Sequence, residues 1–307
     1  MIRVGVVGVG AMGHHHARIY RQLEGCNLVG IYDVDARRSG QFCKEHDIVA
    51  FSTLDALLEV VDAVSVAVPT PDHHLVGMRC LEAGRDLLIE KPMASTLEEA
   101  DELNHTARGS QLILQVGHVE RYNPALEALT EMIVEPRFFE VDRLGSFAPR
   151  SLETDVILDL MIHDIDVLHA LVDSEVEEVR AVGVPILSDA IDIANARLAL
   201  SNGCVANLTA SRVSANRVRK VRIFQPEAYF SVDYTDQQVH YFQLVRRNGH
   251  AQRIAARQLE VKHAEPLARQ LSDFINSVRS RQPPRVDGAA GRRALSTALK
   301  IRDAVQT

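Results

Sequence analysis

Residues 4–13 read VGVVGVGAMG, an apolar run that leads into glycines at positions 8, 10 and 13. A strand, a GxGxxG loop and a helix in this order are typical of a dinucleotide-binding fold. In such a loop Gly8 permits the tight turn, Gly10 lets a pyrophosphate approach the backbone, and Gly13 lets helix and strand pack closely. The helix N-terminus then presents unpaired N–H groups to the anion. We therefore expect five residues of this segment to bind the cofactor: Gly8, Gly10, Ala11, Met12 and Gly13.

An acidic residue follows the second predicted strand. Asp33 lies twenty residues after Gly13, directly after the apolar run 28–32. A carboxylate in this position accepts hydrogen bonds from the adenosine ribose hydroxyls and repels a 2′-phosphate, so the sequence predicts NAD as the cofactor. Arg37 and Arg38 are close enough to accommodate a 2′-phosphate, and NADP stays the alternative.

The first 118 residues alternate short apolar runs with helical patterns. This alternation predicts a mostly parallel sheet, and we expect a Rossmann domain over residues 1–118. The predicted strands are 4–7, 28–32, 63–68, 87–89 and 112–116. The predicted helices are 11–23, 54–60, 74–83 and 96–107, the last one capped by Ser95 with Glu98 three residues on.

Past Tyr122 the pattern changes to that of an α+β domain, which we expect over residues 119–307. One strong helix is predicted over 159–171, and a largely antiparallel sheet follows it. Its strands are expected near 178–186, 192–200, 204–212, 218–225, 228–234 and 238–246. Two helices close the chain, one with an apolar face from Leu267 to Val278 and one after Asp287.

Composition bounds the function. The chain has 307 residues, 46% hydrophobic and 24% charged, which suits two folded domains and excludes wholesale disorder. A net charge of -7 lacks the basic surplus of non-specific nucleic-acid binding. The four cysteines show no CxxC spacing, so a reducing cytoplasm is the expected location. With no spanning run and no signal-peptide pattern, we expect a soluble protein without a membrane partner.

Lys91 is the first candidate for acid–base chemistry. It follows the predicted strand 87–89 in the tripeptide Glu90-Lys91-Pro92, and open α/β sheets bind ligands at this end of their strands. Pro92 is compatible with a cis peptide bond. Alone, the tripeptide is better explained as an exposed lysine before a proline. Residues near two strand ends are expected to line the cofactor: Pro69, Thr70, His73, Glu90 and Lys91.

Asp159 and His163 are spaced four apart in an otherwise apolar helical stretch. That spacing places carboxylate and imidazole on one helix face. The Asp fixes the tautomer of the His, which can then take a hydroxyl proton as general base. Asp166 extends the cluster and allows a metal interpretation, but we predict no metal because the dinucleotide motif already accounts for redox chemistry. Nor do the adjacent residues 14–16, all histidine, converge on one ion, because neighbours in a helix point about 100° apart.

In this order the GxGxxG loop, Val68-Pro69-Thr70, Glu90-Lys91-Pro92 and the helix with Asp159 and His163 resemble the Gfo/Idh/MocA family of NAD(P)-dependent oxidoreductases. The resemblance spans nearly the whole chain. It implies a Rossmann domain and a C-terminal α+β domain whose large open sheet forms oligomer contacts, so a homodimer or homotetramer is expected. It also implies that Lys91 and His163 handle the proton, with Asp159 alongside.

Within the family, residues 115–124, QVGHVERYNP, and residues 207–214, NLTASRVS, look like a branch acting on UDP-N-acetylhexosamines. That branch implies oxidation of the C3 hydroxyl of UDP-N-acetylglucosamine to a 3-keto sugar, which a partner aminotransferase can aminate. A cationic run without acids, from Arg212 to Arg222, suits a pyrophosphate, although a strand decorated with cations explains it as well. The expected substrate-binding residues are Lys91, Arg121, Tyr122, Asn123, Asp159, His163 and Arg212.

Two alternatives stay open. One is a related dehydrogenase of a free sugar, an inositol or the uronate form of the same nucleotide sugar. The other is a non-catalytic NAD-binding regulator on the same fold, since fold does not fix function. The presence of Lys91, Asp159 and His163 together favours an enzyme, because a regulator does not need a proton-handling set.

Overall fold

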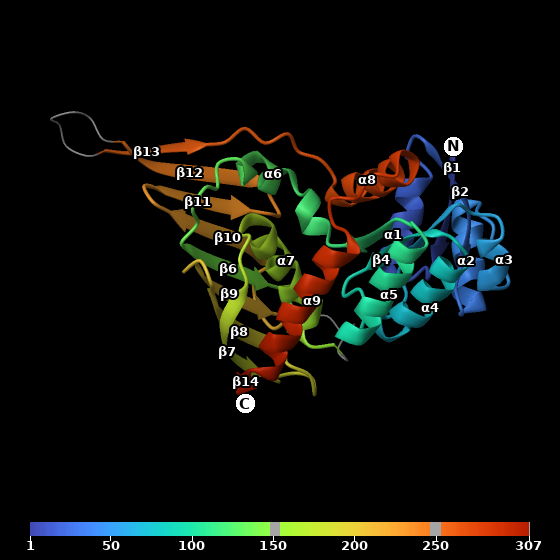
Figure 1. Ribbon diagram of the computed structural model, residues 1–307, viewed down its shortest axis with the longest axis horizontal. Helices are drawn as coiled ribbons and strands as arrows, with labels where there is room; N and C mark the ends of the chain where they lie inside the picture. Colours follow the sequence, from blue (N-terminus) through green and yellow to red (C-terminus); the bar gives the residue numbers. More distant parts are fainter. Residues whose placement is uncertain (148–153, 246–252, 307) are drawn as a thin grey trace. The chain divides into compact units, whose positions relative to one another are not determined.

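The computed structural model describes residues 1–147, 154–245 and 253–306. The chain divides into two compact units (Figure 1). The first contains residues 1–119 and 267–295, and the second contains residues 120–266 and 296–307. In the described part of the chain, no helix combines the length and apolar character that a membrane crossing requires.

The first unit contains the predicted parallel sheet, with strand order β2-β1-β3-β4-β5. Strands β3 and β4 are buried along their whole length, as expected for a sheet with helices on both faces. The strands are β1 (Ile2–Val7), β2 (Cys26–Tyr32), β3 (Ala63–Val66), β4 (Asp86–Glu90) and β5 (Leu114–Gly117). The connecting helices are α1 (Ala11–Tyr20), α2 (Ala36–His46), α3 (Leu54–Leu58), α4 (Thr70–Glu82) and α5 (Leu97–Gly109).

Several helices of this unit differ from the sequence prediction, and α4 begins at Thr70, four residues before its predicted start. Helix α2 was not expected, because it buries only Ser39 and Phe42 and so shows little apolar periodicity. Its start is marked instead by a polar cap, since the Asp35 side chain accepts hydrogen bonds from two backbone N–H groups. Helix α5 begins one residue later than predicted. Its capping box joins Thr96 to Glu99 rather than Ser95 to Glu98.

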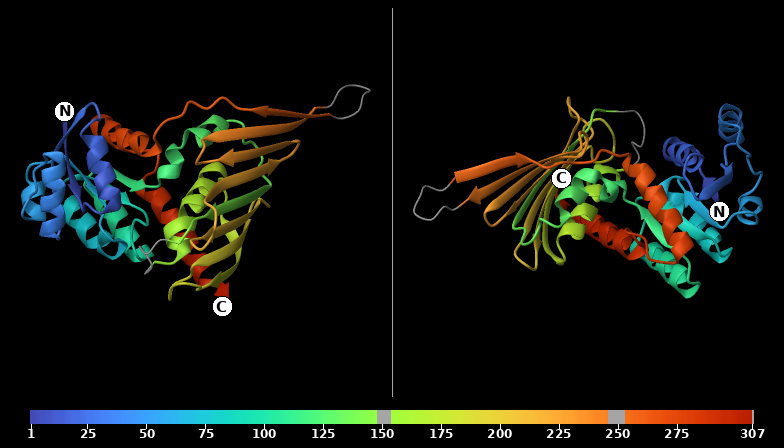
Figure 2. Two further views of the ribbon diagram at one scale, coloured as in Figure 1. Left: turned by 180° about the vertical axis from the view of Figure 1, so that it is seen from behind. Right: turned by 90° about the horizontal axis from the view of Figure 1, so that it is seen from above.

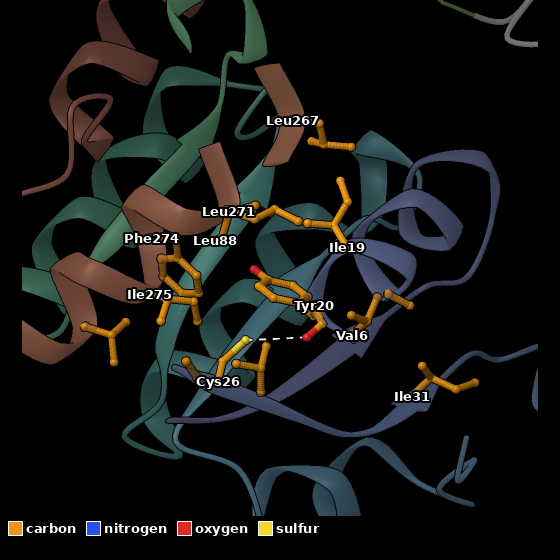
Figure 3. Packing of buried hydrophobic residues seen from close by; sticks show 14 of the residues in the cluster. Val6, Ile19, Tyr20, Cys26, Ile31, Leu88, Leu267, Leu271, Phe274 and Ile275 are labelled. Atoms are coloured by element: carbon orange, nitrogen blue, oxygen red, sulfur yellow. Dashed lines mark hydrogen bonds between the residues drawn. The ribbon is translucent and has the colours of Figure 1, made fainter. Parts of the chain in front are cut away.

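Helix α8 (Pro266–Ser280) is apolar on one face, and residues 267–295 pack with the first unit. The sequence analysis assigned them to the second domain. The spacing of apolar residues shows which face of a helix is buried but not which sheet covers it. Figure 3 shows side chains of α8 in one cluster with α1 and β4: Leu271, Phe274, Ile275, Tyr20 and Leu88.

The second unit is built on a nine-stranded mixed sheet of order β13-β12-β11-β10-β6-β9-β8-β7-β14 (Figure 2). Its pairs are antiparallel except β6 with β9 and β7 with β14, so the expected mainly antiparallel sheet is confirmed. Its strands are β6 (Phe138–Leu144), β7 (Val176–Val184), β8 (Ile193–Leu200), β9 (Val205–Ser211), β10 (Val218–Gln225), β11 (Ala228–Asp233), β12 (Gln238–Val245), β13 (Arg253–Gln258) and β14 (Val305–Gln306). The predicted end of β12 at residue 246 lies outside the described residues.

Strand β6 is the main feature of this sheet that the sequence analysis missed. It pairs with both β9 and β10, and its residues alternate between half-buried and buried. Also unpredicted were β13, β14 and helix α6 (Pro124–Thr130). The predicted helix over 159–171 consists of a π-helical turn, Ile157–Met161, followed by α7 (Ile162–Leu171). Helix α9 (Gly288–Asp303) follows α8 along the chain.

The packing of α8 can be tested by truncating one ring. Phe274 is fully buried, so Phe274→Ala should lower the free energy of unfolding of the first unit by about 3–5 kcal/mol. Asn276→Ala, at an exposed position of the same helix, is the matched control. Urea denaturation measures both variants. Equal, small losses in the two variants would contradict the placement of α8 in this core.

Candidate functional site

The glycine loop joins β1 to α1 through a very close backbone approach. Gly8 has φ of +82°, a conformation that favours glycine. A Cβ on residue 13 would lie 1.8 Å from the Gly8 carbonyl oxygen. In contrast, a Cβ on Gly10 would meet nothing within 4 Å, and Ala11 and Met12 are exposed in the first turn of α1. The loop therefore has open space beside helix N–H groups, which suits a dinucleotide pyrophosphate.

Asp33 organises this loop from the end of β2. Its Oδ2 accepts a hydrogen bond from the Val9 N–H at 2.8 Å, and its Oδ1 accepts one from the Asp35 N–H at 2.9 Å. The Arg38 guanidinium lies 3.3 Å from Oδ2. The spacing rule predicted the carboxylate as a ribose acceptor, but it did not predict that the same group holds Val9 inside the loop. A ribose contact of Asp33 stays a prediction.

Lys91 lies directly after β4, at the carboxyl edge of the parallel sheet, and is half-buried. The Lys91-Pro92 peptide bond is cis, the isomer that the sequence left open. Glu90 is buried, and its Oε1 lies 3.1 Å from Nε2 of His16 on α1. The end of β4 thus carries a partly accessible amine next to a carboxylate that is held inside the unit.

The predicted cofactor residues after β3 have different surroundings. Pro69 is exposed at the N-cap of α4, and Thr70 is half-buried at its first position. His73 is 1% exposed, and both ring nitrogens contact main-chain carbonyls, Nδ1 with Pro92 O at 2.7 Å and Nε2 with Val68 O at 2.9 Å. Burial lowers the pKa of His73. A cofactor contact of these residues stays a prediction.

A buried ionic network lies in the second unit and was missed by the sequence analysis. Arg143 on β6 donates two hydrogen bonds to Asp164 on α7, at 2.7 and 2.8 Å, and one to Glu120 at 3.0 Å. All three side chains are almost fully buried. Burial opposes the charge of Arg143, but the two carboxylates raise its pKa. Such a network holds its elements in one geometry, because breaking it leaves an uncompensated buried charge.

The predicted substrate residues 121–123 directly follow Glu120 of this network along the chain. Arg121 contacts Asp166 on α7 at 3.2 Å and retains 16% of its side-chain exposure. Tyr122 and Asn123 are buried. The Asn123 side chain caps α6 and donates a hydrogen bond to the Tyr234 carbonyl at 3.1 Å. Of the three, Arg121 therefore has the most exposed side chain.

Asp159 and His163 are both half-buried, on either side of the junction between the π-helical turn and α7. The Asp155 side chain starts this stretch by accepting hydrogen bonds from the Ile157 and Leu158 N–H groups, both at 2.9 Å. The sequence prediction placed Asp159 and His163 on one face of a regular α-helix. Asp159 lies instead in the π-helical turn, which has more residues per turn and changes the angle between the two side chains. Single π-helical turns occur frequently at functional sites.

Arg212 does not stand in an acid-free environment. Its Nε donates a hydrogen bond to Asp192 at 2.7 Å, and the side chain is buried. Burial alone would raise the pKa of Asp192, but hydrogen bonds from Leu187, Ile186 and Ser188 hold it well below its usual range. Arg212 thus belongs to the support of a turn.

Three further cations of this run lie near carboxylates of other segments. Lys220 lies 3.5 Å from Asp233 on β11, and Arg222 lies 2.6 Å from Glu140 on β6. Arg219 lies 3.6 Å from Glu120. The run lacks acids along the sequence, yet the strand register supplies them, which weakens it as a signal for pyrophosphate.

No group of three or more His, Cys, Asp or Glu side chains within the described residues is arranged to hold a metal ion. The three adjacent histidines have separate surroundings. The His14 ring packs edge-on against Phe42 and His46, at 5.1 and 4.8 Å between ring centres, His15 is exposed and His16 is fully buried. The four cysteines are free.

The Asp166 carboxyl gives a pH-dependent test. Burial raises its pKa from the ordinary value of 3.8 to about 7, although the Arg121 guanidinium opposes this rise. Between these pH values the folded state binds more protons, so this group's contribution to the free energy of unfolding falls as the pH rises. Asp166→Asn should remove that fall. Relative to the wild type, the variant should gain about 1 kcal/mol or more between pH of about 5 and about 8, measured by urea denaturation. Parallel pH profiles would contradict this assignment.

Two family models match this chain. The oxidoreductase family with an NAD-binding Rossmann fold matches residues 2–118, and the GFO/IDH/MocA C-terminal domain matches residues 135–230. A curated UDP-N-acetylglucosamine 3-dehydrogenase from Acidithiobacillus ferrooxidans is 40% identical over 309 residues, covering 99% of this chain and 97% of that protein.

Solved structures and further relatives agree. The structure of UDP-N-acetylglucosamine 3-dehydrogenase GnnA from Acidithiobacillus ferrooxidans has a TM-score of 0.93, covering 99% of this chain and 97% of that one at 40% identity. The inositol 2-dehydrogenase of Rubrobacter xylanophilus is 31% identical over 60% of this chain and 56% of that protein. With a GxGxxG loop, a lysine after β4 and both family domains in place, this chain belongs to the Gfo/Idh/MocA family of NAD-binding oxidoreductases.

Proposed function

We propose that this protein oxidises the C3 hydroxyl of UDP-N-acetylglucosamine and transfers the hydride to NAD, giving a 3-keto nucleotide sugar. The observation that carries the proposal is the 40% identity with the Acidithiobacillus ferrooxidans dehydrogenase over 99% of this chain. Because the match covers 99% of this chain, the aligned stretch extends through both units and is not confined to the Rossmann fold.

We assign the removal of the C3 hydroxyl proton to two side chains. His163 takes this proton as general base, and the Lys91 amine is the second proton-handling group. Asp159 supports the charged form of His163. When NAD is bound, it supplies the hydride acceptor, which is the step that amino-acid side chains cannot provide.

We assign different roles to the proposed substrate residues of the second unit according to the exposure of their side chains. Arg121 is the residue we assign to the anionic part of the nucleotide sugar, because its guanidinium is partly exposed. Tyr122, Asn123 and Arg212 are buried, so we assign them to the support of the binding surface. A 3-keto product has a carbonyl group that an aminotransferase in the same cytoplasm can aminate. We also propose a homo-oligomer, as the family resemblance implies.

Inositol dehydrogenases among the relatives supply the second candidate, oxidation of a cyclic polyol. The Rubrobacter xylanophilus enzyme matches only 60% of this chain at 31% identity, whereas the nucleotide-sugar enzyme matches nearly all of it. The better coverage favours the nucleotide sugar. A non-catalytic NAD-binding regulator does not require Lys91, Asp159 and His163 together.

NADH formation by the purified protein tests this proposal. The protein is incubated with NAD and one of UDP-N-acetylglucosamine, its uronate, UDP-glucose, free N-acetylglucosamine or inositol, with a ketone trap present. We expect the absorbance band of NADH to appear with UDP-N-acetylglucosamine alone. Reaction confined to a free sugar or inositol would overturn the nucleotide-sugar assignment. If no substrate gives NADH although the protein binds NAD, the non-catalytic regulator would be favoured.

Variants separate the chemical role from folding. His163→Ala and Lys91→Ala should each lower kcat by about 10²–10⁴-fold, the usual contribution of a positioned acid or base. Affinity for NAD, measured by fluorescence titration, should change little for His163→Ala. Loss of NAD binding together with turnover in that variant would show that His163 is structural.

Asp33 and Arg38 test the choice of NAD. Loss of a charge-assisted hydrogen bond costs about 1.5–3 kcal/mol, so Asp33→Ala should weaken NAD binding about 10- to 100-fold. NADP should be affected less, because the carboxylate repels its 2′-phosphate. Arg38→Ala is the matched variant and should weaken NADP more than NAD. Equal weakening of both dinucleotides by Asp33→Ala would assign Asp33 to the loop alone.

A further inference from the structure

The two sequence neighbours of Lys91 are each held by a buried histidine from a different helix. His16 on α1 is 0% exposed and approaches the Glu90 side chain at 3.1 Å. His73 on α4 is 1% exposed and contacts the Pro92 carbonyl at 2.7 Å. Lys91 itself, between them, is half-buried. Both contacts lie within the first unit.

His73 joins two turns that follow neighbouring strands. Its Nδ1 contacts Pro92 O after β4, and its Nε2 contacts Val68 O after β3. A carbonyl oxygen only accepts, so each contact becomes a hydrogen bond only when the ring nitrogen carries a proton. Burial lowers the pKa of His73 and favours the neutral ring, which has one N–H, while the two carbonyls favour the charged ring, which has two. The contact between Nδ1 and the Pro92 carbonyl is the shorter of the two.

His16 fixes the Glu90 side chain in a comparable way. Its Nδ1 lies 2.7 Å from the Ser65 hydroxyl, which can donate to it and leave the proton of the neutral ring on Nε2, the nitrogen nearer Glu90. Within the described part of the chain, neither His16 Nε2 nor Glu90 Oε1 has a hydrogen-bond partner, so the two buried atoms meet as a close polar contact at 3.1 Å. On the other side, a Cβ on Gly117 would lie 2.5 Å from Glu90 Oε1, so β5 leaves room for the carboxylate.

We propose that His16 and His73 are positioning residues that set the Lys91 amine for proton handling by holding Glu90 and Pro92. The inference rests on the role of Lys91 in the proposed dehydrogenase. A general stabilising role would spread contacts over the core. Here one nitrogen of each ring contacts a residue directly before or after one lysine, while the other nitrogen contacts Ser65 or Val68, on or just after β3.

Substitution by asparagine or glutamine tests the contact of each ring nitrogen separately. The Asn side-chain amide takes the place of Nδ1, and the Gln side-chain amide takes the place of Nε2. His73→Asn keeps the Pro92 contact, and His73→Gln keeps only the Val68 contact. His16→Gln keeps the Glu90 contact, and His16→Asn keeps only the Ser65 contact. Because small displacements of a reacting group cost up to about 10²-fold in rate, we expect kcat of H73Q to lie about tenfold or more below H73N. We expect the same of H16N against H16Q, with KM for NAD similar within each pair.

The exposed His105 gives the control pair, H105N and H105Q, which should have equal kcat. Thermal unfolding of all variants separates positioning from stability. Equal losses of kcat in both members of each pair, in parallel with Tm, would overturn the proposal.

A second measurement does not depend on the substrate. The rate of reductive methylation of Lys91 in the NAD complex, followed by peptide mass spectrometry, reports the environment of its amine. H73Q and H16N should change this rate several-fold relative to H73N and H16Q. Equal labelling rates would overturn the positioning role. A wild type that does not oxidise UDP-N-acetylglucosamine would overturn only the proposed function, and the labelling rates then decide this inference.

Discussion

The cofactor half of this protein depends on one close backbone contact, in which the Gly8 carbonyl occupies the space that a side chain at Gly13 would need. Without that contact β1 and α1 could not turn so tightly into each other. The turn leaves the space beside Gly10 open and lets the Asp33 carboxylate reach the Val9 N–H at 2.8 Å. The predicted pyrophosphate and ribose contacts thus depend on the same backbone geometry.

Parallel strand order then places the remaining chemistry. The carboxyl ends of β1, β3 and β4 lie on one edge of the sheet, so the glycine loop, the Val68 turn and Lys91 are neighbours by topology. In the second unit a buried ion pair fixes the position of the elements, because Arg143 on β6 is hydrogen-bonded to Asp164 on α7. Each unit therefore holds its candidate residues through buried polar groups, whose loss costs more than that of exposed ones.

Local spacing explains what the sequence could predict. The GxGxxG loop, Asp33, the strand alternation and Lys91 after β4 are all local patterns, and the structure has each element in its predicted place. Long-range partners were not predictable. The acids that face Arg222 and Lys220 come from other strands, and α8 packs against a sheet far earlier in the chain, as the bond between Arg281 and Asp86, 195 residues apart, illustrates. Nothing in the run of three histidines marked His16 as the buried one.

The central claim is that hydride leaves C3 of the sugar. UDP-N-acetylglucosamine carrying deuterium at C3 is incubated with the protein and NAD, and the reduced cofactor is analysed by mass spectrometry. The account predicts singly deuterated NADH, formed together with a 3-keto sugar that has lost its label. Unlabelled NADH, with deuterium retained in the sugar, would contradict it and move the oxidation to another carbon.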